Sequence, residues 1–120
     1  MAVACTDAEW KIMEVLWESQ PRTMAEITRA LEPETGWTRH TVITLLKRMQ
    51  EKGSVSVDES GPVKRYAPRM TRLEASADQT QRLLSRVFHG KASLLLHSLV
   101  DAGQVTAEEM RELLEMLERK

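Results

Sequence analysis

At 120 residues, the chain is long enough for one or two small domains, and its net charge of −1 argues against a protein that coats nucleic acid with its whole surface. Its 42% hydrophobic content permits a packed core, but only 4% of the residues are aromatic, so Leu, Val, Ile and Met must fill that core. The single cysteine, Cys5, excludes an internal disulfide, and no apolar run approaches the roughly 18 residues of a membrane span, so we expect a cytoplasmic protein with no membrane insertion.

Four Thr-x-x-Glu patterns mark predicted helix starts. In such a capping box the Thr side chain accepts a hydrogen bond from a free backbone N–H of the first turn, and the Glu side chain reaches back to the Thr N–H. The four pairs are Thr6/Glu9, Thr23/Glu26, Thr71/Glu74 and Thr106/Glu109. Each is followed by helical periodicity, so we expect a helix after each of them.

The first two boxes predict helices over 7–19 and 24–31. Proline lacks the backbone N–H that a helix needs, so Pro21 should separate the two helices. The second helix is expected to bury Ile27, Ala30 and Leu31. The segment 32–36 is rich in turn-forming residues and is predicted to be a connection. Trp37 follows, and we expect it to pack against the next helix.

The segment 38–53 is predicted to form one helix with two faces. One face repeats apolar residues at the helical spacing and would seal a core: Val42, Leu45, Leu46 and Met49. A second stripe has the same spacing and is flanked by Arg39 and Arg48: His40, Ile43, Thr44 and Lys47. This face suits a nucleic-acid groove, because Thr side chains reach base edges while Arg and Lys meet phosphates. For this helix taken alone, an ordinary solvated basic face is the alternative.

After Gly53 the apolar period changes from 3.6 to 2, so 54–57 and 63–67 are predicted to form a β-hairpin. Between residues 38 and 72 there are eight Lys or Arg and three acidic residues, a local balance of 8 − 3 = +5. Lys64 and Arg65 lie just beyond the hairpin tip, and we expect them to contact phosphates. The alternative is that they keep an edge strand soluble.

Three helices followed by a hairpin is the element order of a winged helix-turn-helix, whose third helix enters the major groove of DNA. The predicted fold class is therefore mainly α with a small β-hairpin. We expect 1–70 to be a winged-helix DNA-binding domain and 71–120 a helical dimerisation domain with three helices. These helices, over 71–88, 91–102 and 108–119, carry more apolar surface than they can bury among themselves, which indicates a second copy as partner. The expected dimer contacts are Leu84, Val87, Phe88, Leu95, Leu99, Met110, Leu113, Leu114 and Leu117.

Several segments resemble the penicillinase-repressor family, which includes the β-lactamase, methicillin-resistance and copper-transport repressors. They are Thr-Asp-Ala-Glu-Trp at 6–10, Val-Leu-Trp at 15–17, Thr-Val-Ile-Thr-Leu-Leu-Lys-Arg-Met at 41–49 and Lys-Gly at 52–53. The resemblance implies a homodimeric winged-helix repressor that binds a palindromic operator in double-stranded DNA and blocks transcription. It also implies operator contacts at the positions of His40, Thr41, Ile43 and Thr44, with basic residues at the helix flanks and the wing.

The chain departs from the family's pattern in three places. His40 and Ile43 stand where the β-lactam repressors tend to carry Lys and Arg, so the base preference is not carried over. Antibiotic-linked members are inactivated by cleavage at an Asn-Phe pair, and His97-Ser98 occupies the matching position here. A sensor protease is therefore a candidate partner, but this chain lacks the Asn-Phe bond that such a protease cuts in antibiotic-linked members. The Cys-x-Cys motifs of the copper-sensing members are absent, and we expect no metal at His89 and His97 and no cofactor.

Two functions of other classes are alternatives to repression. A winged-helix adaptor for protein–protein interaction, without DNA binding, would show no salt-dependent DNA shift and would carry an apolar patch in place of the basic stripe. An enzyme is disfavoured, because the sequence has no Gly-rich phosphate loop, no set of His, Cys and Asp at ligand spacing, and no nucleophile with a base.

Overall fold

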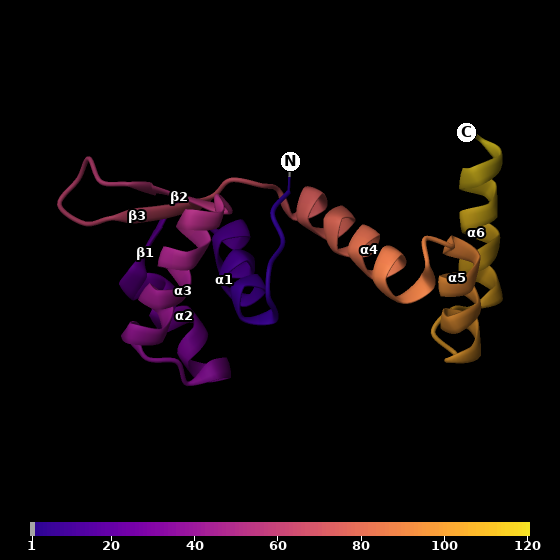
Figure 1. Cartoon of the computed structure of the whole chain (residues 1–120), viewed down its shortest axis with the longest axis horizontal. Coiled ribbons are helices and arrows are strands. Elements are labelled where there is room, and N and C mark those ends of the chain that lie inside the picture. The colour runs from indigo at the N-terminus through magenta and orange to yellow at the C-terminus, as the bar shows by residue number, and fades with distance from the viewer. Residues whose placement is uncertain (1) are drawn as a thin grey trace. The chain divides into compact units, whose positions relative to one another are not determined.

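The computed structural model describes residues 2–120 as six helices and a small three-stranded sheet (Figure 1). The helices are α1 (Asp7–Glu18), α2 (Met24–Thr35), α3 (Arg39–Lys52), α4 (Arg72–Phe88), α5 (Ala92–Asp101) and α6 (Ala107–Glu118). The strands are β1 (Arg22–Thr23), β2 (Val55–Asp58) and β3 (Arg65–Pro68). The predicted fold class, mainly α with a β-hairpin after the third helix, is confirmed.

All four predicted capping boxes are present. In α1, α2 and α6 the Thr side chain and the Glu side chain each accept from the other's backbone N–H. At the start of α4, the Thr71 N–H donates to Glu74 at 2.9 Å and the Glu74 N–H donates to Thr71 at 3.1 Å. These hydrogen bonds to the charged form lower the pKa of the carboxyl groups of Glu26, Glu74 and Glu109. Local sequence therefore determines where these helices begin.

Helix α2 is longer than predicted, because it continues through Pro33 to Thr35. Pro33 lies in the last turn, where its missing N–H removes a ladder bond only near the helix end. Gly36 ends the helix with a φ of +67°, a left-handed conformation that glycine adopts readily, and its N–H donates to the Glu32 carbonyl at 2.8 Å. The prediction of a connection over 32–36 is therefore wrong except at its last residue.

A single cluster of buried hydrophobic side chains joins α1, α2, α3 and the sheet. It contains the whole predicted apolar face of α3, namely Val42, Leu45, Leu46 and Met49. Trp37 packs against it partly buried. From α2 it takes Ile27 and Leu31, whereas Ala30 is exposed. The prediction that Ala30 is buried is wrong, because the core is packed by Met24, Ile27 and Leu31 and Ala30 lies outside that face of the helix.

The sheet contains one strand that periodicity did not predict. β1 pairs antiparallel with β3, so that Arg22 lies opposite Tyr66 and Thr23 opposite Arg65. β3 also pairs with β2 and is therefore the central strand of the order β1-β3-β2. Because Thr23 both ends β1 and caps α2, the end of β3 nearest the hairpin loop is fixed directly to the start of that helix.

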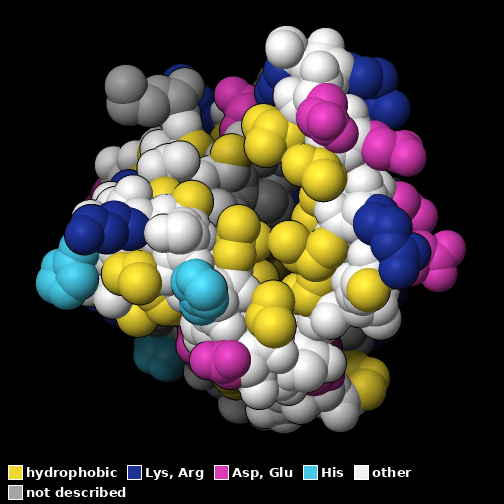
Figure 2. Space-filling model, turned by 90° about the vertical axis from the view of Figure 1, so that its right-hand side faces the viewer, with side chains coloured by type: hydrophobic (Ala, Val, Ile, Leu, Met, Phe, Trp, Pro, Cys, Tyr) yellow, Lys and Arg dark blue, Asp and Glu magenta, His cyan; other side chains and the backbone are white. Residues whose placement is uncertain are grey.

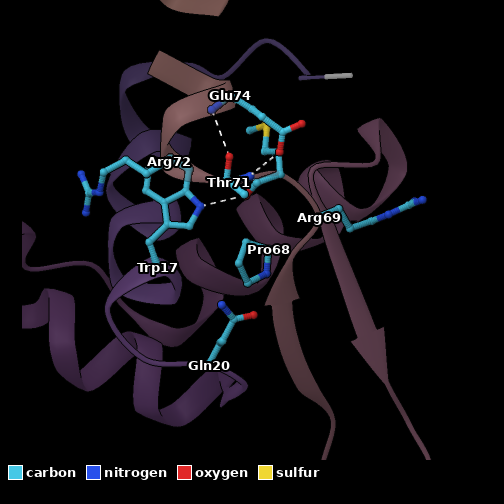
Figure 3. A pocket seen from close by; sticks show the side chains of 8 residues that line it. Trp17, Gln20, Pro68, Arg69, Thr71, Arg72 and Glu74 are labelled. Carbon is cyan, nitrogen blue, oxygen red and sulfur yellow. Dashed lines mark hydrogen bonds between the residues drawn. The ribbon is translucent and has the colours of Figure 1, made fainter. Parts of the chain in front are cut away.

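The chain forms two compact units, of which the first ends at Gln79 and the second runs from Thr80 to Lys120. The first turns of α4 belong to the first unit. Ala75 is only 2% exposed, and the Trp17 ring N–H donates to the Met70 carbonyl at 2.9 Å, just before the helix. The Arg72 guanidinium lies over the Trp17 ring, 5.0 Å from its centroid (Figure 3). The first unit therefore reaches beyond the domain end predicted at residue 70. None of the helices in the described chain has the length and hydropathy needed to cross a membrane.

Candidate nucleic-acid interface

Helix α3 turns its second stripe to solvent. His40, Ile43, Thr44 and Lys47 are all exposed, as are the flanking residues Arg39 and Arg48, while Thr41 is half-buried. The opposite face of the helix is sealed in the core, and Ile43 still exposes 43% of its surface. The helix thus has the two faces that its sequence predicts. Contact between the exposed stripe and a nucleic acid stays a prediction.

The threonines of α3 are already engaged in hydrogen bonds. The Thr44 hydroxyl donates to the His40 carbonyl at 2.9 Å, one turn earlier in the helix. Thr38 caps the helix by accepting from the Thr41 N–H at 3.4 Å, and the two hydroxyl oxygens lie 3.5 Å apart. While its proton is donated to His40 within the helix, the Thr44 hydroxyl is left to accept a further bond. It therefore suits an amino group on a base edge, such as N4 of cytosine or N6 of adenine.

Three cations on α3 are available for a partner. Within residues 2–120, no ion pair of 4 Å or less engages Arg39, Lys47 or Arg48. In the hairpin, Lys64 pairs with Glu59 at 3.3 Å, but both side chains are more than 60% exposed. Such a surface pair is weak and readily exchanged for a phosphate contact.

The tip of the hairpin is organised by Asp58. Its carboxylate accepts from the Ser60 N–H at 2.9 Å and from the Ser60 hydroxyl at 2.6 Å, and this turn points the following residues back along β3. The two hydrogen bonds from Ser60 lower the pKa of Asp58, and the nearby Arg65 charge lowers it further. Arg65 is exposed at the start of β3.

A groove of about 360 Å³ brings the stripe of α3 and the hairpin together. It is lined by Met24, Ala25, Arg39, Ile43, Pro62, Val63, Lys64 and Tyr66. Arg39 and Ile43 from α3 therefore share one surface with Lys64 from the hairpin, although they are far apart in sequence. Thr44, Lys47 and Arg48 lie outside this groove. The start of α2 also lines it, and sequence reasoning missed this because Met24 and Ala25 carry neither charge nor hydrogen-bonding side chain.

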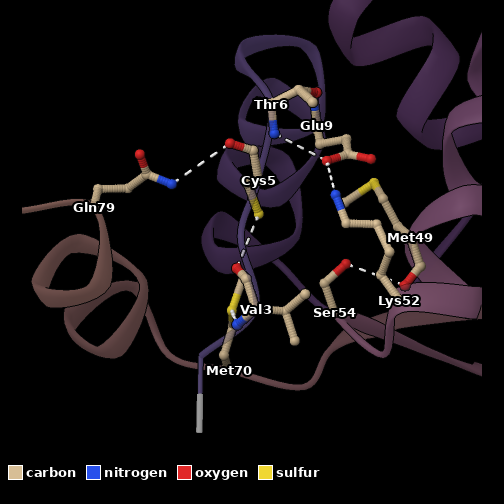
Figure 4. Close-up of polar contacts among 9 residues, drawn as sticks. All are labelled: Val3, Cys5, Thr6, Glu9, Met49, Lys52, Ser54, Met70 and Gln79. Atoms are coloured by element: carbon tan, nitrogen blue, oxygen red, sulfur yellow. Dashed lines mark hydrogen bonds and ion pairs between the residues drawn. The ribbon is translucent and has the colours of Figure 1, made fainter. Parts of the chain in front are cut away.

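An ion pair between the partly exposed Lys52 and a buried carboxylate links the other end of α3 to the start of α1 (Figure 4). The Glu9 side chain is fully buried, and its Oε1 accepts from Lys52 Nζ at 2.7 Å and from the Thr6 N–H at 2.9 Å. Its Oε2 has no hydrogen-bond partner in the described chain. Burial raises the pKa of Glu9, but the bonds from Lys52 and Thr6 outweigh it and lower the pKa overall. The pair was not predicted, because it joins residues 43 positions apart.

The chain's cysteine and histidines form no cluster. Cys5 is a free, half-buried thiol, and burial raises its pKa, which keeps it protonated and weakly nucleophilic. Among residues 2–120, no three His, Cys, Asp or Glu side chains come together in a way that could hold a metal ion.

The second unit carries the predicted dimer contacts on a surface with little burial. Val87, Leu113, Leu114 and Leu117 are 49–68% exposed. The other five are half-buried, namely Leu84, Phe88, Leu95, Leu99 and Met110. Five further apolar residues that were not predicted are also exposed, namely Leu83, Leu94, Leu96, Val100 and Met116. Figure 2 faces this end of the chain and shows hydrophobic side chains gathered in a patch bordered by charged ones. Exposed patches of this kind mark interaction surfaces. Dimerisation through these residues stays a prediction.

A family model described as penicillinase repressor matches residues 5–119. The chain belongs to the penicillinase-repressor family. The penicillinase repressor of Bacillus licheniformis is 26% identical over 113 residues, which cover 94% of this chain and 88% of that protein. The solution structure of the DNA-binding domain of the repressor BlaI matches with a TM-score of 0.54 and 26% identity, over 60% of this chain and 88% of that one.

A second solved structure shows a family member on DNA. It is monomeric BlaI of Bacillus licheniformis in complex with the blaP half-operator, with a TM-score of 0.52 and 28% identity, over 57% of this chain and 84% of that one. With the family shown across nearly its whole length, this penicillinase-repressor chain is a DNA-binding transcriptional repressor and not an enzyme. The expectations of a winged-helix repressor and of this family are confirmed.

Proposed function

We propose that this repressor binds a palindromic operator as a homodimer, with α3 of each copy in a major groove and the hairpin across the neighbouring backbone. The observation that carries the proposal is the single groove shared by Arg39 and Ile43 of α3 and Lys64 of the hairpin. The base-facing residues are His40, Thr41, Ile43 and Thr44, and the phosphate-facing residues are Arg39, Lys47, Arg48, Lys64 and Arg65. The exposed basic residues around the stripe disfavour a protein–protein adaptor, which would present an apolar surface there.

Dimerisation gives the repressor its affinity. The exposed apolar residues of the second unit would pair two copies and set their α3 helices about 34 Å apart, one turn of DNA. The second half-site contact then becomes intramolecular, so two weak contacts combine into a tight one. The repressor would work in the cytoplasm, where it meets the operator. A sensor protease stays a candidate partner, but it would have to cut a bond other than an Asn-Phe pair, because His97 and Ser98 stand there.

The salt dependence of binding tests this function. A dimer that neutralises roughly seven phosphates should show log affinity falling against log salt with a slope near −6. The full chain would be titrated with a palindromic fragment from upstream of its own gene and with a scrambled fragment, at several salt concentrations. A slope near zero, or equal affinity for both fragments, would contradict the proposal.

Two substitutions in α3 distinguish residues that contact phosphates from residues that contact base edges. Arg48→Ala should weaken binding to every DNA alike, because phosphates are the same in all sequences. Thr44→Ala should instead narrow the difference between the operator and the scrambled fragment, because it removes an acceptor at a base edge. Gln104→Ala, an exposed change outside the proposed DNA-binding residues, is the control and should bind as the wild type does. Equal loss of specificity in both variants would count against the assigned roles.

A further inference from the structure

Ile43 is chemically out of place on the exposed stripe of α3. Its neighbours on that stripe are His40, Thr44 and Lys47, all polar or charged. The core face of the helix is made by other residues, so Ile43 is not needed to seal it. Yet 43% of this β-branched side chain is exposed. A single exposed apolar side chain is ordinary by itself, but this one lies among polar and charged side chains and lines a groove between α3 and the hairpin.

The groove beside Ile43 is lined by both apolar and cationic side chains. Val63 of the hairpin, itself 53% exposed, and Met24 of α2 line it together with Ile43, while Arg39 and Lys64 supply positive charge. A partner that fits this surface is an anion with an apolar group held at a fixed place. The bases of a DNA major groove meet this description, because phosphates flank them on both sides.

Only one apolar group lies on the base edges of the major groove, the 5-methyl group of thymine. The other base-facing side chains of α3 supply hydrogen bonds, and Thr44 is left to accept one while its proton is donated to His40. Ile43 can neither donate nor accept a hydrogen bond. We propose that Ile43 is a specificity-determining residue, which reads a thymine in each half-operator by packing against its 5-methyl group. This inference rests on the proposed function.

The expected size of the effect follows from the burial of one methyl group. Burying that group contributes about 0.8 kcal/mol, which is about a fourfold change in affinity for each half-site. Cytosine lacks the methyl and presents an amino group in its place, so it should be discriminated against at this position.

The test compares thymine with deoxyuridine, which lacks only the 5-methyl group. The preferred DNA would first be selected from a randomised duplex library with the full chain. Each thymine of the selected half-site is then replaced singly by deoxyuridine. For the wild type, one replacement should weaken binding by about fourfold per half-site, whereas for Ile43→Ala the same replacement should change it by less than about 1.5-fold. At that position, 5-methylcytosine should bind more tightly than cytosine to the wild type only.

Two further variants control the test. Ile43→Val keeps a branched apolar side chain and should retain most of the methyl effect, even if Ile43→Ala folds poorly. Thr44→Ala should keep the whole methyl effect while it loses discrimination elsewhere. If the library yields no preferred sequence and binding shows no salt dependence, the repressor function itself fails. If a preferred sequence is found but no deoxyuridine position depends on residue 43, the function stands and the role of Ile43 is overturned.

Discussion

The two units of the chain start their helices in the same way but bury very different amounts of apolar surface. Every buried hydrophobic residue in the described chain lies between Ile12 and Ala75, within the first unit. In the second unit, none of residues 80–120 is buried, and Leu117 is 68% exposed. Both units nevertheless have helices that begin at a complete capping box. The difference lies in tertiary packing and not in local helix signals.

The difference in burial indicates a different role for each unit. The first unit has its own hydrophobic core, which fixes the positions of α3 and the hairpin. A surface that recognises base sequence needs such fixed side chains. In the second unit, α5 has 10 residues and α6 has 12. Isolated helices of this length are not stable in water. The stability of the second unit should therefore depend on a partner surface, and hence on protein concentration.

The largest effect should come from the core of the first unit. Leu46→Ala removes a fully buried side chain of α3 and should lower the free energy of unfolding by about 2–5 kcal/mol. Leu73→Ala is the matched control, because Leu73 is 80% exposed and its loss should cost less than about 0.5 kcal/mol. Urea unfolding followed by tryptophan fluorescence measures both. Similar losses in the two variants would show that the first unit has no self-sufficient core.

A change in the second unit should act on association instead. Leu114→Asp places a charge on an apolar side chain that is 54% exposed, and it should weaken dimerisation by roughly a hundredfold, because an interface would have to bury that charge. Sedimentation of the full chain over a range of concentrations measures this, with Gln104→Asp as the control at an exposed polar position. If the wild type sediments as a monomer at micromolar concentration, the second unit does not form a dimer surface and this prediction is wrong.

The ion pair between Lys52 and the buried carboxylate of Glu9 gives the core of the first unit a pH dependence. The folded-state pKa of Glu9 is below its ordinary value of 4.5, so its contribution to stability is complete above about pH 4.5 and is lost as the pH falls through the lowered folded value. Glu9→Gln should lower the free energy of unfolding at pH 7 by about 1–3 kcal/mol, and the difference from the wild type should shrink in acid.

The matched control for that pair is Glu14→Gln, an exposed change on the same helix. Glu14 lies 3.8 Å from Arg72, in a surface pair worth little. Urea unfolding at several pH values between 7 and 3 should show a pH-dependent loss for Glu9→Gln and almost none for Glu14→Gln. A loss in Glu9→Gln that does not change with pH would mean that packing, and not charge, holds the end of α3.

Local patterns predicted most of the elements and the exposed stripe of α3. The capping boxes and the spacing of Val42, Leu45, Leu46 and Met49 act through neighbours in sequence, so the helix starts and the core face of α3 could be predicted. The end of α2 could not be predicted, because Pro33 and the turn-forming residues beside it favour an earlier helix end, whereas the helix continues to the Gly36 cap. Strand β1 has only two residues and thus no periodicity to detect.

The features of the first unit that escaped prediction depend on contacts distant in sequence. The lining of the groove by Met24 and the ion pair of Glu9 with Lys52 exist only once the helices pack. The stripe on α3 could be predicted because all of its members lie on one helix. For the second unit, the sequence indicates an excess of apolar surface, but the residues that a partner covers depend on that partner.

The smallest effect should come from a helix start in the second unit. Thr106→Ala removes the cap of α6, where the Thr106 side chain accepts from the Glu109 N–H at 3.1 Å, and should cost about 1 kcal/mol. Because α6 packs so little, the loss should remain local and appear as faster hydrogen exchange of the backbone amides over 107–110, with the unfolding of the first unit unchanged. Thr106→Ser keeps the hydroxyl and should restore protection. If Thr106→Ala instead lowers the unfolding midpoint of the first unit as well, the two units unfold as one cooperative body. The first unit would then not be stable by itself, and the contrast between the two units would be wrong.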